Sequence, residues 1–249
     1  MRAGFAIQFP FSSSSLLLAS WTLLSSGSLL APRIGRDAAM LASFGAVTIL
    51  VAGTRPDSAR KPIRLHASFA AFASGFASYP AWAALIAVVG VGLDLPWRRA
   101  TPPGAGSPAL WLATLVLAPI FEELLYRARL IPALREWISA PLAIVATSAL
   151  FALPHLEPWN VLGTFLVGLM LGTVYVTTES IAICIALHAG LNAACLACGV
   201  PPVRLALSPL ASAVVGSLLL AASLLWLRAG PTHRLASSAT RRSLETAHG

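Results

Sequence analysis

Long apolar runs, separated by short polar or proline-containing segments, follow one another along almost the whole chain of 249 residues. A helix that spans a bilayer needs about 20 mostly apolar residues to cross about 30 Å of hydrocarbon. We expect eight runs to form such helices: residues 12–31, 37–53, 66–93, 108–127, 138–155, 160–177, 180–198 and 206–228. The pattern therefore predicts an all-α fold, a polytopic membrane helical bundle of about eight transmembrane helices.

The same pattern predicts a single transmembrane domain over residues 1–230, followed by a polar, mobile C-terminal tail over residues 231–249. The segment 94–107 is the one long linker rich in proline and glycine. The first run is rich in serine and follows Arg2, so a cleaved signal peptide competes with a retained first span. Pro80 is expected to tilt or break the third helix, and Pro154 to bend or end the fifth.

Composition agrees with a membrane protein. The chain is 57% hydrophobic and 10% charged, with a mean hydropathy of +0.79, whereas a soluble domain has roughly 25% charged residues. The net charge of +8 fits basic loops that face anionic lipid better than it fits nucleic acid. We therefore expect the lipid bilayer, and no nucleic acid, as a partner.

The basic residues predict an orientation. If the N-terminus is inside, twelve Lys and Arg residues lie in cytoplasmic segments and five lie outside, which fits the positive-inside rule. We expect an integral membrane protein of a bacterial cytoplasmic (inner) membrane, with both termini cytoplasmic. The cytoplasmic set is Arg2, Arg55, Arg60, Lys61, Arg64, Arg127, Arg129, Arg135, Arg228, Arg234, Arg241 and Arg242.

Ionisable side chains are costly at membrane depth, so those inside apolar runs are functional candidates. The fourth run ends with Glu122, Glu123 and Arg127. At about 100° per residue, Glu123 and Arg127 share one helix face in the order that favours an ion pair, which predicts a structural clamp. Glu122 is then left to face the bundle interior as an unpaired carboxylate. The alternative is that all three residues only mark the boundary between helix and water.

Two further runs carry polar groups. His155 follows Pro154, where the expected helix break predicts a wet pocket. His188 and Asn192 are four residues apart and share a face, and Gly190 between them allows close backbone approach. Simple counting places Glu122 and His155 at opposite ends of their spans. Their convergence therefore requires tilted or broken helices.

Three motifs stand in a fixed order: Glu122-Glu123-x-x-x-Arg127, Phe151-x-x-x-His155 and His188-x-x-x-Asn192. Together, over a core of about residues 108–198, they resemble the CPBP family of intramembrane proteases. That family includes the Rce1-like branch, which processes prenylated CAAX C-termini. Its other members are implicated in bacteriocin self-immunity and in the cleavage of C-terminal sorting signals.

This resemblance implies a glutamate-type endopeptidase. Glu122 is implied to activate water together with His155, and His188 and Asn192 to stabilise the oxyanion. The residues in supporting positions are Glu123, Arg127 and Phe151. The implied substrate is a membrane-anchored protein, lipidated in the CAAX manner or carrying a hydrophobic sorting tail, which is cut near its C-terminus.

Other readings stay open at this point. No cofactor is expected to be required, but Glu122, His155 and His188 also form a two-histidine, one-carboxylate set of the kind that binds catalytic zinc. The competing functions are a non-catalytic membrane protein of the same fold, acting in bacteriocin immunity or as a scaffold, and a proton-coupled transporter. Gly168-x-x-x-Gly172 predicts close packing of its helix against a neighbour.

Overall fold

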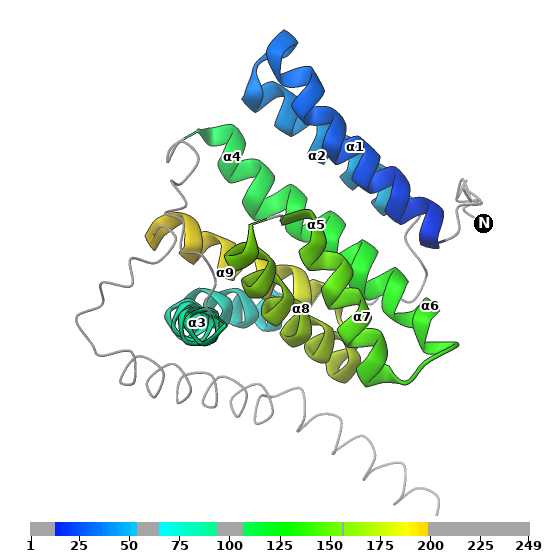
Figure 1. The fold of residues 1–249 in the computed structure, drawn as a ribbon, viewed down its shortest axis with the longest axis vertical. Helices are drawn as coiled ribbons and strands as arrows, with labels where there is room; N and C mark the ends of the chain where they lie inside the picture. The colour runs from blue at the N-terminus through cyan, green and yellow to red at the C-terminus, as the bar shows by residue number, and fades with distance from the viewer. Residues whose placement is uncertain (1–12, 54–64, 94–106, 156, 199–249) are drawn as a thin grey trace, which may run out of the picture.

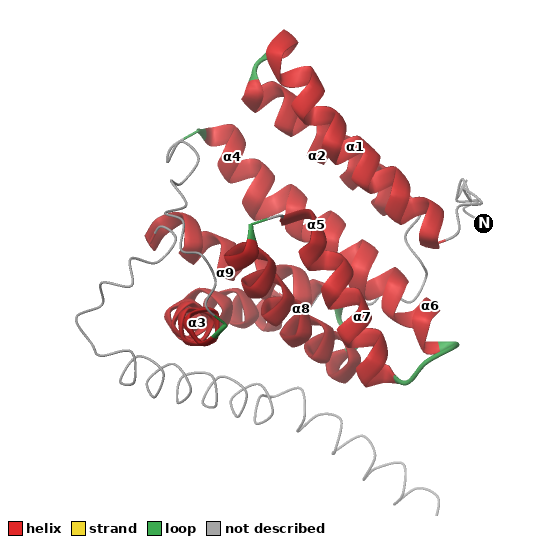
Figure 2. Cartoon of the chain, viewed as in Figure 1, coloured by secondary structure: helices red, strands yellow, loops and turns green. Residues whose placement is uncertain are grey.

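The computed structural model describes residues 13–53, 65–93, 107–155 and 157–198. Every element within these ranges is helical, so the all-α fold class is confirmed (Figures 1 and 2). The elements are α1 (Ser13–Ile34), α2 (Arg36–Gly53), α3 (Leu65–Gly92), a long helix (Pro108–Arg135), α7 (Ala140–Ala152), the 3₁₀ turn η4 (Leu153–His155), α8 (Pro158–Thr178) and α9 (Ile181–Cys198). The long helix comprises α4 (Pro108–Leu112), η2 (Ala113–Leu117), α5 (Ala118–Glu122), η3 (Glu123–Leu130) and α6 (Ile131–Arg135).

Several helices suit a bilayer. Within the described ranges, α1, α2, the long helix and α8 are long and apolar enough to cross it, and the regions of α7 and α9 form shorter apolar helices. The chain is an integral membrane protein. The count of eight spans is not confirmed, because four helices meet the requirement and the expected segment 206–228 lies outside the described residues. The predicted tail 231–249 lies outside them as well.

A one-residue connection joins α1 to α2. Gly35 has φ of 85°, a left-handed conformation that favours glycine and ends a helix without steric strain. The two helices pack side by side and lie along one flank of the long helix (Figure 1). Nε1 of Trp21 donates to the hydroxyl of Tyr126 at 3.1 Å, which ties α1 to the long helix.

The backbones of α3 and α9 touch where the two helices cross. A Cβ atom at Gly190 would lie 2.1 Å from the carbonyl oxygen of Phe72, and one at Gly75 would lie 2.2 Å from that of Leu187. Only glycine allows this separation, so the close approach predicted at Gly190 is confirmed. α3 continues through Pro80 as one helix instead of breaking there.

Helix α8 packs against α7 through its small residues. A Cβ at Gly168 would lie 2.9 Å from Cβ of Ser148, and one at Gly172 would lie 2.9 Å from Cγ2 of Ile144. This confirms the packing predicted from the glycine spacing. α7 ends at Ala152, and the 3₁₀ turn that follows contains Pro154, as the proline predicts.

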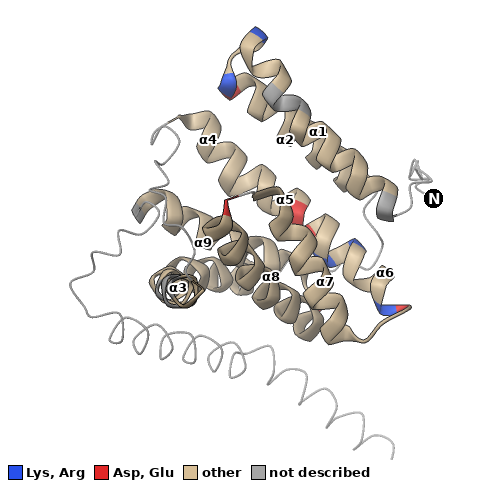
Figure 3. Cartoon of the chain, in the orientation of Figure 1, with Lys and Arg blue, Asp and Glu red and all other residues tan. Residues whose placement is uncertain are grey.

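The long helix extends farther than its hydrophobic pattern suggested. It was expected to stop at Arg127, but it continues to Arg135 and is about 42 Å long at 1.5 Å per residue. Arg127 is 1% exposed, so counting it among cytoplasmic loop residues was wrong. Figure 3 shows charge in the middle of this helix as well as at helix ends. The orientation of the termini stays a prediction.

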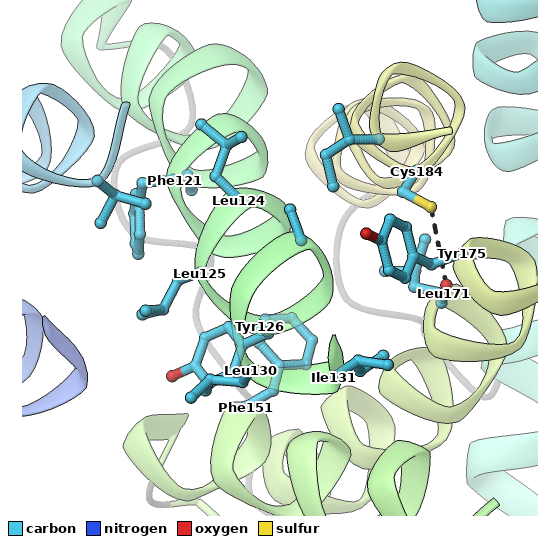
Figure 4. Close-up of a cluster of buried hydrophobic side chains, with 14 of the residues drawn as sticks. Phe121, Leu124, Leu125, Tyr126, Leu130, Ile131, Phe151, Leu171, Tyr175 and Cys184 are labelled. Atoms are coloured by element: carbon cyan, nitrogen blue, oxygen red, sulfur yellow. Dashed lines mark hydrogen bonds between the residues drawn. The ribbon is translucent and has the colours of Figure 1, made fainter. Parts of the chain in front are cut away.

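A buried apolar cluster surrounds this middle part (Figure 4). Phe121, Leu125 and Ile131 project from the long helix and are at most 2% exposed. The same cluster includes Leu171 of α8 and Cys184 of α9, whose thiol lies 3.7 Å from the Leu171 carbonyl oxygen. Helices α7, α8 and α9 cover Glu123 and Arg127 of the long helix and hold them away from solvent.

Candidate active site

Two π-helical segments shape the long helix, and each one precedes a proline. The N–H of Ala118 bonds to the carbonyl of Ala113, five residues back, and the next residue, Pro119, has no N–H. The same five-residue bond stands immediately before Pro132. A proline inside a helix removes one hydrogen bond and crowds the preceding turn, and the wider π turn accommodates both effects.

The second π segment begins where the carboxylates lie. Glu122 is the last residue of α5 and Glu123 the first of η3. A π turn contains more residues than an α turn, so the angle between consecutive side chains is smaller. The two neighbouring carboxylates can therefore both reach α9.

Glu123 and Arg127 form a fully buried ion pair. Nη1 of Arg127 donates to Oε1 of Glu123 at 2.9 Å, and the two side chains are 1% and 0% exposed. Nη2 of Arg127 donates to the carbonyl of Gly168 at 3.3 Å, and its guanidinium lies 4.5 Å from the ring centroid of Phe151. The clamp predicted from the spacing is therefore present, and α7 and α8 hold it in place.

His188 of α9 lies between the two glutamates. Its Nδ1 is 2.9 Å from Oε1 of Glu123, and its Nε2 is 3.6 Å from Oε2 of Glu122. A carboxylate in an ion pair with Arg127 only accepts hydrogen bonds, so Nδ1 of His188 is the donor in this contact. This bond turns Nε2 toward Glu122. The resemblance implies that Glu122 acts with His155, and the structure gives Glu122 a further partner by bringing His188 within ion-pair distance of it.

His155 occupies a different position, in the exposed 3₁₀ turn after α7. The ring of Phe151 lies edge-on to both imidazoles, with centroids 5.8 Å from His155 and 5.8 Å from His188. Phe151 therefore contacts both histidines. The structure places His155 at the rim of the arrangement and His188 inside it.

Asn192 lies one turn after His188 and faces the same long helix. Its Nδ2 donates to the backbone carbonyl of Thr114 at 2.9 Å. The expected shared face is thus confirmed, since His188 and Asn192 both contact the long helix. The hydrogen bond to Thr114 was not predicted, because its acceptor is a backbone carbonyl, which every type of residue has. In the sequence, the feature that could have indicated this bond is Pro119, because a proline leaves one helix carbonyl without its backbone donor.

The positions of the possible metal-binding side chains bear on the zinc alternative. Within the described parts of the chain, no three His, Cys, Asp or Glu side chains gather closely enough to hold a metal ion. Nδ1 of His188 faces Glu123 and its Nε2 faces Glu122, so Nε2 is the ring nitrogen that could serve a metal ion.

Comparison with known proteins bears on the same region. Residues 104–194 match the family model described as type II CAAX prenyl endopeptidase, Rce1-like. Over these residues the chain is similar to the Rce1-like family. The match covers the long helix, α7, α8 and most of α9, including all three motifs that carry the resemblance. The chain is therefore a CAAX-type intramembrane protease, a peptide hydrolase, and its substrate is a membrane-anchored protein. No curated protein and no solved structure matches the chain.

Proposed function

We propose that this protein hydrolyses a peptide bond near the C-terminus of a membrane-anchored substrate, with Glu122 as the base that activates water. The observation that carries the proposal is the buried row Arg127, Glu123, His188 and Glu122, each within 3.6 Å of the next. Charged side chains at this depth occur where they pair with another charge or take part in the protein's function. Glu123 contacts both Arg127 and His188 through Oε1, whereas the contact of Glu122 is the longer one to His188.

The charges of this row suit proton transfer. Two carboxylates and one guanidinium leave one negative charge, which a single proton shared between Glu122 and His188 neutralises. When His188 holds that proton, Glu122 is free to accept a proton from water. The water oxygen then attacks the substrate carbonyl carbon. The N–H at Nε2 of His188 can stabilise the oxyanion that forms.

Breakdown of the tetrahedral intermediate completes the reaction. The carbon–nitrogen bond breaks as Glu122 passes its proton to the leaving nitrogen, so one water and one amide give a carboxylic acid and an amine. In this proposal His155, at the rim, helps to hold the attacking water. Phe151 contacts both imidazoles and covers the Arg127 guanidinium.

We propose the tail of a prenylated protein as the substrate class, in keeping with the description of the matching family. A hydrophobic sorting tail is the other substrate consistent with the motifs. Two quenched peptides of the same length, one farnesylated on cysteine and one with an unmodified apolar tail, distinguish the two substrate classes when the purified protein is assayed in detergent.

The decisive variant is Glu122→Gln, which keeps the size of the side chain and removes the base. We expect cleavage to fall by roughly 100-fold or more, since general base catalysis contributes about that much. The matched control is Glu136→Gln at an exposed position just after the long helix, which should cleave normally. Full activity of Glu122→Gln would overturn the mechanism. A wild-type protein that cuts neither peptide would instead favour a non-catalytic role.

A further inference from the structure

We infer that Asn192 is a positioning residue whose side chain caps a backbone carbonyl that Pro119 leaves without a helical donor. The bond sets the register of α9 against the long helix, and with it the place of His188 beside the two glutamates. This role differs from the oxyanion contact that the family resemblance implied for Asn192.

The inference starts from backbone hydrogen bonds around Thr114. In an α-helix its carbonyl would accept from residue 118, and in a π-helix from residue 119. The N–H of Ala118 bonds to Ala113 instead, and Pro119 has no N–H. The carbonyl of Thr114 therefore lacks a main-chain donor within the long helix. Nδ2 of Asn192 supplies one at 2.9 Å, an ordinary distance for a strong hydrogen bond.

The location of this bond gives it consequences for the site. A carbonyl without a partner is costly at membrane depth, so α9 is held where Asn192 reaches Thr114. His188 lies one turn before Asn192 on α9, and Glu122 lies about two turns after Thr114 on the long helix. With this contact fixed, His188 lies one turn along α9 on the side of the glutamates, where its ring nitrogens reach both of them. The glycine crossing sets α9 against α3, whereas the Asn192 bond sets α9 against the long helix.

A stability cycle in detergent tests the cap without any substrate. Asn192→Ala is measured in the wild type and in a Pro119→Ala background, with Asn160→Ala on an exposed turn of α8 as the matched control. We expect Asn192→Ala to lower the Tm of the wild type by roughly 4 °C or more. In the Pro119→Ala background residue 119 has an N–H, the helix can close its own bonds, and the loss should nearly vanish. Equal losses in both backgrounds, or none in either, would overturn the inference.

A second measurement separates positioning from direct contact with the substrate. Ring ¹⁵N spectra of labelled histidine report the proton on Nδ1 of His188, identified by its absence in His188→Ala. We expect Asn192→Ala and Asn192→Asp to shift or broaden that signal, because neither side chain can donate to Thr114. An unchanged signal with a lower kcat would assign Asn192 to the oxyanion and refute the positioning role.

The consequence for catalysis rests on the proposed function, and the two can fail separately. If the mechanism is correct, Asn192→Ala lowers kcat at an unchanged KM, since His188 is displaced while the substrate surface is intact. If the wild type cuts no peptide, the proposed function fails, but the Tm cycle and the histidine spectra still decide the role of Asn192.

Discussion

Glu123→Gln removes one charge from the most deeply buried ion pair described here. The change keeps the size of the side chain but leaves the guanidinium of Arg127, which is 1% exposed, without its counter-charge. Breaking a buried pair in this way costs about 3–5 kcal/mol, more than most single substitutions. With about 2–4 °C lost per kcal/mol in a protein of this size, the Tm should fall by roughly 6–20 °C.

The assay is thermal unfolding of the purified protein in one detergent, with Glu136→Gln as an exposed control that should leave the Tm unchanged. The double variant Glu123→Gln with Arg127→Met removes both charges, so it should recover more than half of the loss. A Glu123→Gln protein that unfolds within 2 °C or so of the wild type, on the scale just given, would refute the reasoning. That result would mean that water or another group compensates Arg127.

Three further outcomes are expected. Gly190→Ala should lower the Tm strongly and reduce cleavage, because the added Cβ would lie 2.1 Å from the backbone oxygen of Phe72. The control is Gly45→Ala, whose added Cβ would have no atom within 4 Å, so it should be neutral in both assays. Phe151→Leu should slow cleavage and lower the Tm by several degrees. The reason is that edge-on ring contacts and the contact to a guanidinium contribute about 0.5–2 kcal/mol each. An unchanged cleavage rate and Tm would show that the ring is not needed beside the imidazoles. Turnover should persist after exhaustive treatment with a chelator, and activity that is lost and then restored by zinc would revive the metal alternative.

Local patterns predicted the helices well. Runs of apolar residues gave seven of the described helices, because the need to satisfy backbone hydrogen bonds in lipid leaves little choice of structure. The ion pair of Glu123 with Arg127 was also predictable, since residues four apart face each other on any helix. The end of the fourth helix was predicted wrongly. A charge normally marks the membrane surface, but Arg127 is neutralised and covered by its neighbours.

The contacts between site residues on different helices could not be predicted from local patterns. Glu123 and His188 are 65 residues apart, and Asn192 and Thr114 are 78 apart. Helical periodicity tells which residues share a face, but not which face of another helix they meet. For that reason periodicity did not predict the contact of Glu122 with His188 of α9.

The amino-acid sequence alone determined that the chain is helical and buried in lipid, which side chains pair within a turn, and where glycine allows helices to touch. Only the tertiary structure decided that Glu122, Glu123 and His188 form one row and that Asn192 meets a backbone carbonyl. The physical reason is separation along the chain. Helix propensity and hydrophobic periodicity depend on residues that are only a few positions apart. Contacts between distant segments depend on how helices cross and slide, which packing across the whole bundle sets.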